Sequence, residues 1–121
     1  MSAYQGLPTP IWLALAIFAC GGAPLNAAKL AEANAALHAA ETLGAEQDPK
    51  AKQSLDNARK EVAQAQRLGA DGEGEKGDLH LQRAVVDADL ASQLVRTKRE
   101  QDKAREAWAR SKSGAAASSP Q

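Results

Sequence analysis

The 121-residue sequence predicts an all-α protein, a small antiparallel three-helix bundle with coiled-coil-like hairpins and a disordered C-terminal tail. Three observations indicate this fold class. Apolar residues, most of them alanine, recur at the three- and four-residue spacing of a helix face. No segment shows the alternation of apolar and polar residues that a half-buried strand requires. Breaks that contain glycine or proline divide the chain into three helical segments joined by short turns, the pattern of a bundle.

The first helix is expected over residues 26–43. Asn26 suits the N-cap position, where a side-chain oxygen accepts a hydrogen bond from a backbone N–H. Gly44 suits the position just after a helix, because glycine adopts the left-handed conformation without steric cost. Leu30 and Leu37 lie seven residues apart, which predicts a narrow apolar stripe on this helix.

The second helix begins at the clearest local signal in the chain, Asp48 followed by Pro49. Aspartate is a favoured N-cap, and proline suits the first helical position because its missing N–H would have no helical partner there. We expect this helix to end at Leu68 and Gly69. Its apolar residues alternate at spacings of four and three, as in a heptad seam: Ala51, Leu55, Ala58, Val62 and Ala65.

A glycine-rich segment, residues 69–78, predicts a mobile, solvated loop between the second and third helices. It holds four glycines in ten residues. Asp78 is the expected N-cap of the third and longest helix, which we expect to run to about Arg110. The first half of this helix shows two apolar faces, which predicts burial against two partners. One face carries Leu79, Val86, Leu90 and Leu94, and the other carries Leu81, Val85, Ala88 and Val95.

Beyond Arg96 the apolar residues of the third helix become sparse. We expect this part to project past the bundle or to contact another molecule. The composition of residues 111–121 is typical of a disordered tail. The helical domain is therefore expected over residues 26–110.

The N-terminal segment carries an apolar run, residues 11–19, and no charged side chain precedes Lys29. The run is too short to cross a bilayer as a helix, which takes about 20 apolar residues. Its length suits the apolar region of a secretory signal peptide, which ends at small residues. We therefore expect residues 1–19 to be a signal peptide and residues 20–25 to be a modified N-terminus and short tether.

The end of the apolar run resembles the lipobox of bacterial lipoproteins. Ile17, Ala19, Cys20 and Gly21 fit the motif, whereas Phe18 is bulkier than the residue usual at its position. The resemblance implies that Cys20 receives a diacylglyceryl group, that cleavage occurs before it, and that its new amino terminus is acylated. Because Gly21 is not aspartate, the family analogy implies an outer-membrane lipoprotein that faces the periplasm.

A second interpretation remains open for the same residues. The first ten residues carry no lysine or arginine, although a signal peptide normally has a positive N-terminal region. The apolar run is then an uncleaved hydrophobic anchor, and Cys20 is an ordinary thiol. The protein would be a coiled-coil adaptor in the cytoplasm or at the inner membrane.

Two stretches resemble a known family. They carry Leu43-Gly44-Ala45, then Pro49, then the ladder of Leu55, Ala58, Val62 and Ala65, and finally Ala88-Asp89-Leu90-Ala91. Over roughly residues 27–105 the chain is similar to an alanine-rich domain of unknown function found in bacterial envelope lipoproteins, often ahead of an OmpA-like peptidoglycan-binding domain. The resemblance implies a helical envelope domain and carries over no catalytic or ligand-binding residue.

Composition and motifs argue against an enzyme. A core made mostly of alanine is thin, whereas catalytic pockets are normally lined by larger apolar and aromatic side chains. His38 and His80 lie on different expected helices, so we expect surface histidines and no metal site, cofactor or small-molecule substrate. The formal net charge is zero, which gives no overall bias toward nucleic acid. The expected role is structural or in protein interaction, through an envelope protein or self-association.

The candidate interaction residues lie in the basic segment 96–112. It holds seven basic and three acidic residues. A basic helix face could contact anionic lipid or an acidic partner, with Trp108 as an aromatic anchor. The alternative is a solvated helix held by the ion pairs Arg96–Glu100, Lys98–Asp102 and Glu106–Arg110. The basic face carries Arg96, Arg99, Lys103 and Arg110.

Overall fold

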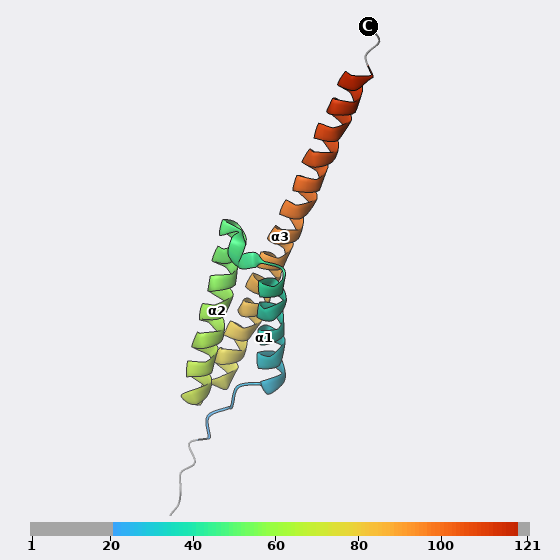
Figure 1. Cartoon of the computed structure of the whole chain (residues 1–121). Helices are drawn as coiled ribbons and strands as arrows, with labels where there is room; N and C mark the ends of the chain where they lie inside the picture. Colours follow the sequence, from blue (N-terminus) through green and yellow to red (C-terminus); the bar gives the residue numbers. More distant parts are fainter. Residues whose placement is uncertain (1–20, 119–121) are drawn as a thin grey trace, which may run out of the picture.

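The computed structural model describes residues 21–118, which fold into three α-helices and one short 3₁₀ helix (Figure 1). The order is α1 (Ala27–Thr42), η1 (Ala45–Gln47), α2 (Pro49–Ala70) and α3 (Gly74–Ala117). The helices pack as an antiparallel bundle, and no strand is present among these described residues. The predicted all-α bundle is therefore confirmed.

The N-termini of α1 and α2 are capped as the sequence predicts. The Asn26 side-chain oxygen accepts hydrogen bonds from the backbone N–H groups of Ala28 and Lys29, at 2.9 and 3.1 Å. The Asp48 carboxylate accepts two equivalent bonds, both 2.9 Å, at the start of α2. Gly44 has a φ of 88°, the left-handed conformation expected after α1. These boundaries agree with what the local capping chemistry predicts.

The expected long loop between α2 and α3 is wrong. Helix α2 continues to Ala70 and α3 begins at Gly74, so the turn contains only three residues. Gly72 supplies the positive φ of 79° that this tight turn needs. Asp78 lies inside α3 and does not cap it. Its carboxylate instead accepts the backbone N–H of Asn26 at 2.9 Å, which ties the start of α1 to α3.

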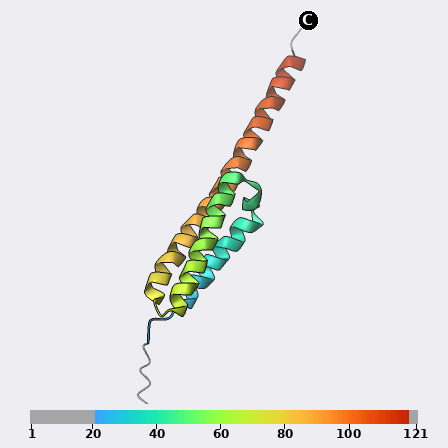
Figure 2. The same cartoon turned by 90° about the vertical axis from the view of Figure 1, so that its left-hand side faces the viewer.

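Helix α3 has 44 residues and is about twice as long as α2. Its first half packs against both α1 and α2, and its second half projects alone beyond the bundle (Figures 1 and 2). The projection was expected. The helix ends at Ala117 and not near Arg110, so residues 111–117 are helical, and residues 119–121 of the expected tail lie outside the described residues. Among residues 21–118, no helix combines the length and apolar character needed to cross a bilayer.

Nine of the thirteen buried apolar residues in the described part of the chain are alanines. Leu55 and Leu81 are its largest fully buried side chains, and they belong to two separate clusters along the bundle. All five residues of the predicted α2 seam are buried, as expected. Alanine lets the helix axes approach closely, but it supplies little apolar area per residue.

One of the two predicted apolar faces of α3 is not buried. Leu81, Ala88 and Val95 lie in the core, as expected. Three residues of the other face are exposed to solvent: Leu79 by 56%, Val86 by 66% and Leu90 by 44%. The correction has a simple geometric reason, because α1 and α2 both lie on the side of α3 that carries the alanines. The sequence pattern shows that a helix face is apolar, but it does not show whether another helix of the same chain covers that face.

Candidate interaction surface

The segment next to Cys20 has a defined seat on the bundle. Cys20 itself, like the expected signal peptide at residues 1–19, lies outside the described residues. Ala23 pairs with Glu73 in a parallel bridge, and the Gly74 N–H donates a 2.8 Å hydrogen bond to the Ala23 carbonyl oxygen. Residues 21–25, which belong to the expected short tether, are therefore held against the α2–α3 turn.

Glycines make this seat possible. A Cβ atom placed on Gly74 would lie 2.2 Å from the Pro24 carbonyl oxygen, and one on Gly22 would lie 2.2 Å from that of Gly72. On Gly77 it would lie 2.6 Å from Leu25 Cδ1. Such contacts are far inside van der Waals distance. The glycines of this segment thus allow close packing of the backbone. The composition alone does not distinguish this use from a flexible loop.

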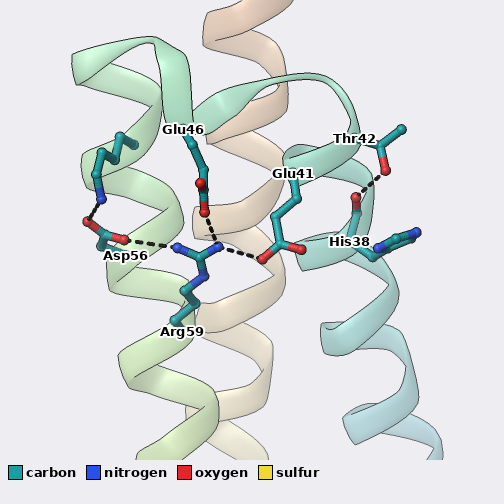
Figure 3. Close-up of polar contacts among 7 residues, drawn as sticks. His38, Glu41, Thr42, Glu46, Asp56 and Arg59 are labelled. Carbon is teal, nitrogen blue, oxygen red and sulfur yellow. Dashed lines mark hydrogen bonds and ion pairs between the residues drawn. The ribbon is translucent and has the colours of Figure 1, made fainter.

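The opposite end of the bundle is held by a charged network around Arg59 of α2 (Figure 3). Its guanidinium contacts the carboxylates of Glu41 on α1 at 2.6 Å and Glu46 on η1 at 2.5 Å, and that of Asp56 at 3.2 Å. These hydrogen bonds raise the pKa of Arg59 further above its ordinary value, first through Glu46 and then through Glu41. A hydrogen bond from Lys52 is the main cause that lowers the pKa of Asp56. The network joins α1, η1 and α2 where α3 leaves the bundle.

Two basic residues hold α3 at the point where it leaves. Arg99 Nη2 donates a 2.5 Å hydrogen bond to the carbonyl oxygen of Leu43, the C-cap of α1. Lys98 Nζ lies 3.4 Å from Asp48 Oδ2 at the start of α2. Arg99 is one of the expected interaction residues of the basic face, and in the bundle its guanidinium also binds the end of α1.

Lys103, Trp108 and Arg110 stand on the projecting part of α3, and Arg96 lies just before it. Lys103 pairs with Glu100 at 3.0 Å, and Trp108 is 62% exposed with the Lys112 ammonium 4.2 Å from its ring centre. Arg96 and Arg110 are also exposed. None of the three ion pairs expected for a solvated helix forms in this described part of α3, where Glu100 and Asp102 instead pair at three-residue spacing. The observed pairs are Lys103–Glu100 and Arg105–Asp102.

The surface that sequence reasoning missed lies on the exposed side of α3. Leu79 and Val86 form the apolar edge of a shallow groove of about 430 Å³ next to α2, which Gln82 and Arg83 also line. Glu61 and Asp87 place two carboxylates along it. The pairing of an apolar ridge with acidic groups is a surface suited to an amphipathic helix that carries basic residues.

His80 contributes to this side of the bundle without forming a metal centre. Its Nδ1 atom lies 2.5 Å from Glu61 Oε2, which joins α3 to α2. His38 is exposed on α1, far from it in sequence. Within residues 21–118, no group of three or more histidine, cysteine, aspartate or glutamate side chains is placed to hold a metal ion.

We expect Asp87→Asn to stabilise the fold at neutral pH. Burial, and secondarily the Glu61 carboxylate, raise the pKa of Asp87 above its ordinary value of 3.8. The folded state therefore disfavours the charged form, and this penalty disappears as the pH falls through the raised pKa toward 3.8. Urea titrations across this pH range should show a higher free energy of unfolding for the variant at neutral pH and convergence with the native protein in acid.

Asp48→Asn is the matched control, because the hydrogen bond from the Ala51 N–H is the main cause that lowers the pKa of Asp48. Its charged form contributes stability above pH 3.8 that is lost as the pH falls through the lowered pKa. The control should therefore be less stable than the native protein at neutral pH. Equal effects of the two variants would contradict the different surroundings of the two carboxylates.

Comparison with known proteins places the chain in a family without a described activity. A family model, Domain of unknown function (DUF4398), matches residues 28–107. This range covers most of α1, all of α2 and α3 into its projecting part, and it agrees with the resemblance over residues 27–105. No curated protein and no solved structure matches the chain. The chain belongs to the DUF4398 family.

Proposed function

We propose that this protein is a non-catalytic bacterial envelope lipoprotein, in which a lipid on Cys20 tethers a helical interaction module to the periplasmic side of the outer membrane. The lipobox-like residues 17–21 supply the acyl acceptor. Each buried CH₂ of an acyl chain adds about 0.8 kcal/mol to membrane binding, and two or more chains give stable anchoring.

The observation that carries the proposal is the docking of residues 21–25. Ala23 is bound at the α2–α3 turn, three residues after Cys20. Three residues of extended chain span about 10 Å, so a lipid on Cys20 fixes this end of the bundle close to the bilayer. A defined binding position directly after an acylated residue would orient the module relative to the membrane.

The interaction role is supported by the surfaces that remain exposed. The bundle offers the shallow groove beside Leu79 and Val86, and the projecting half of α3 offers Trp108 among basic side chains. Both are suited to binding another protein or helix. The alanine core leaves the described residues without a large apolar pocket arranged around convergent polar groups, which is what small-molecule chemistry requires.

Mass spectrometry of the protein isolated from membranes tests the anchor. We expect the native chain to begin at Cys20 and to carry acyl mass, and to sediment with the outer membrane. Cys20→Ala should retain the N-terminal segment, carry no acyl mass and leave the outer-membrane fraction. A native protein that begins at Met1 without acyl mass would rule out the lipoprotein and favour the uncleaved-anchor alternative.

A second variant separates anchoring from sorting. Gly21→Asp keeps the acceptor cysteine but introduces the residue that, by family analogy, retains lipoproteins at the inner membrane. We expect it to be acylated as the native chain is and to move to the inner-membrane fraction. Acylation with unchanged location in both chains would leave the anchor intact and refute the sorting argument.

A further inference from the structure

The exposed large hydrophobic residues of the described chain all lie on one helix and on one side of it. They are Leu79, Val86, Leu90 and Trp108 on α3. At 3.6 residues per turn, these four positions fall within about 40° around the helix axis, opposite the buried Leu81 and Ala88. They form a single stripe, here called the α3 stripe, that runs from the bundle onto the projecting half over about 44 Å. Within residues 21–118 nothing covers it.

The charges along α3 are divided between its two halves. Residues 74–94 carry four acidic and two basic side chains, a net charge of −2. Residues 95–117 carry seven basic and three acidic side chains, a net charge of +4. The acidic half also borders the groove in which Glu61 and Asp87 lie close enough for burial and mutual repulsion to disfavour charge on Asp87. A basic residue from outside would relieve this repulsion.

We propose that a second copy of this chain covers the α3 stripe, with the two α3 helices antiparallel. Opposite directions place the +4 half of each helix beside the −2 half of the other, whereas parallel helices place like charges together. When the midpoints of the two stripes are aligned, Leu79 lies opposite Trp108 of the other copy and Leu90 lies opposite Thr97. In this register Val86 lies opposite Gln101.

The arrangement also gives the projecting half of α3 a partner. From Lys103 to Ala117 every described residue is exposed, although helices in water gain most of their stability from tertiary packing. In the antiparallel pair, Trp108 packs at the Leu79 end of the partner's groove, and Arg105 approaches the two carboxylates there. Because α1 and α2 lie on the far side of α3, the two bundles do not collide.

This pairing rests on the interaction role proposed above and not on the lipid anchor. It identifies the binding partner in that role as a second copy of the same chain. One geometric consequence connects the two proposals. The Gly74 ends of the paired helices lie about 60 Å apart, so two acylated copies on one membrane lie along its surface with an anchor at each end.

Intermolecular disulfide formation tests the register. Two variants are made in the full chain with Cys20→Ser, one with Val86→Cys and one with Gln101→Cys. In mild detergent, each variant is oxidised alone, and an equal mixture of the two is oxidised in parallel. We expect covalent dimer in the mixture only, because identical positions are 15 residues, about 22 Å, apart in the antiparallel pair. If Val86→Cys alone forms as much covalent dimer as the mixture does, the antiparallel arrangement is wrong and a parallel one is indicated.

Sedimentation of the same Cys20→Ser chain measures the strength of the pair. Leu90→Glu places a charge in the centre of the stripe, and we expect at least a tenfold weaker dimer. Ala109→Glu is the matched control, because it adds the same charge at an exposed position of α3 that lies about 120° around the helix axis from the middle of the stripe, and it should change the dimer little. A chain that stays monomeric throughout the micromolar range, or equal effects of the two variants, would refute the proposal.

The two proposals fail separately. The tested chain has no acyl acceptor, so a monomeric result leaves the lipid anchor standing. Conversely, a native protein without acyl mass leaves the dimer standing. Circular dichroism of each variant confirms that the helices are retained, since Val86, Leu90, Gln101 and Ala109 are all exposed.

Discussion

Leu81→Ala is expected to lower the free energy of unfolding by about 3 kcal/mol, within the range measured for leucine-to-alanine changes in cores. Leu81 is fully buried among Ala33, Ala58, Ala65 and Ala84. Small neighbours cannot move far enough to fill the space, because their backbones are already in helix–helix contact. The same change at Leu55, in the second cluster, should cost a similar amount for the same reason.

The loss is large relative to the whole. Small domains have a total free energy of unfolding of about 5–15 kcal/mol. This core has few other large side chains that bury apolar area. Urea titration followed by circular dichroism measures the effect. Leu79→Ala, measured at a protein concentration low enough that the dimer proposed above is dissociated, is the control, because Leu79 is on the same helix but 56% exposed in the single chain, and its change should stay within about 0.5 kcal/mol. Similar losses at Leu79 and Leu81 would contradict the assignment of the buried face.

The elements that local chemistry fixes could be predicted from the sequence. Asn26 and the Asp48–Pro49 pair determine where α1 and α2 begin, since capping needs only residues close in the chain. The buried seam of α2 was predictable because one narrow stripe leaves one choice of face. For α3, two apolar stripes left two choices, and the sequence does not show which of them the same chain covers.

The candidate site depends on contacts between distant segments, and it was correspondingly harder to predict. Arg99 belongs to a basic face in the sequence, yet its partner is a backbone carbonyl 56 residues away. The glycine-rich turn was taken for a loop because glycine serves both flexibility and close approach. Only the position of residues 21–25 distinguishes these two uses, and that position depends on the tertiary structure. Trp108 is exposed, as a contact residue should be, while Cys20 remains a prediction.

Gly74→Ala is expected to destabilise the protein by about 2 kcal/mol, in the range for overpacking of a tight site. The new Cβ would lie 2.2 Å from the Pro24 carbonyl oxygen and 2.4 Å from that of Ala23. Both are backbone atoms, so the clash is relieved only if residues 22–24 move away and the Gly74–Ala23 hydrogen bond breaks. Hydrogen exchange should then show loss of protection at the Gly74 amide, and urea titration should show the lower stability.

The sign of this effect is what makes it informative. Alanine is favoured over glycine inside a helix by about 1 kcal/mol, so propensity alone predicts that Gly74→Ala stabilises α3. Gly114→Ala is the matched control, because Gly114 lies in the same helix and nothing approaches its Cβ position within 4 Å. That change should stabilise or leave the protein unchanged. If both glycines respond alike, residues 21–25 do not bind at the α2–α3 turn, and the main support for the proposed membrane anchor is lost. Opposite signs would show that the glycine is retained for the docked segment.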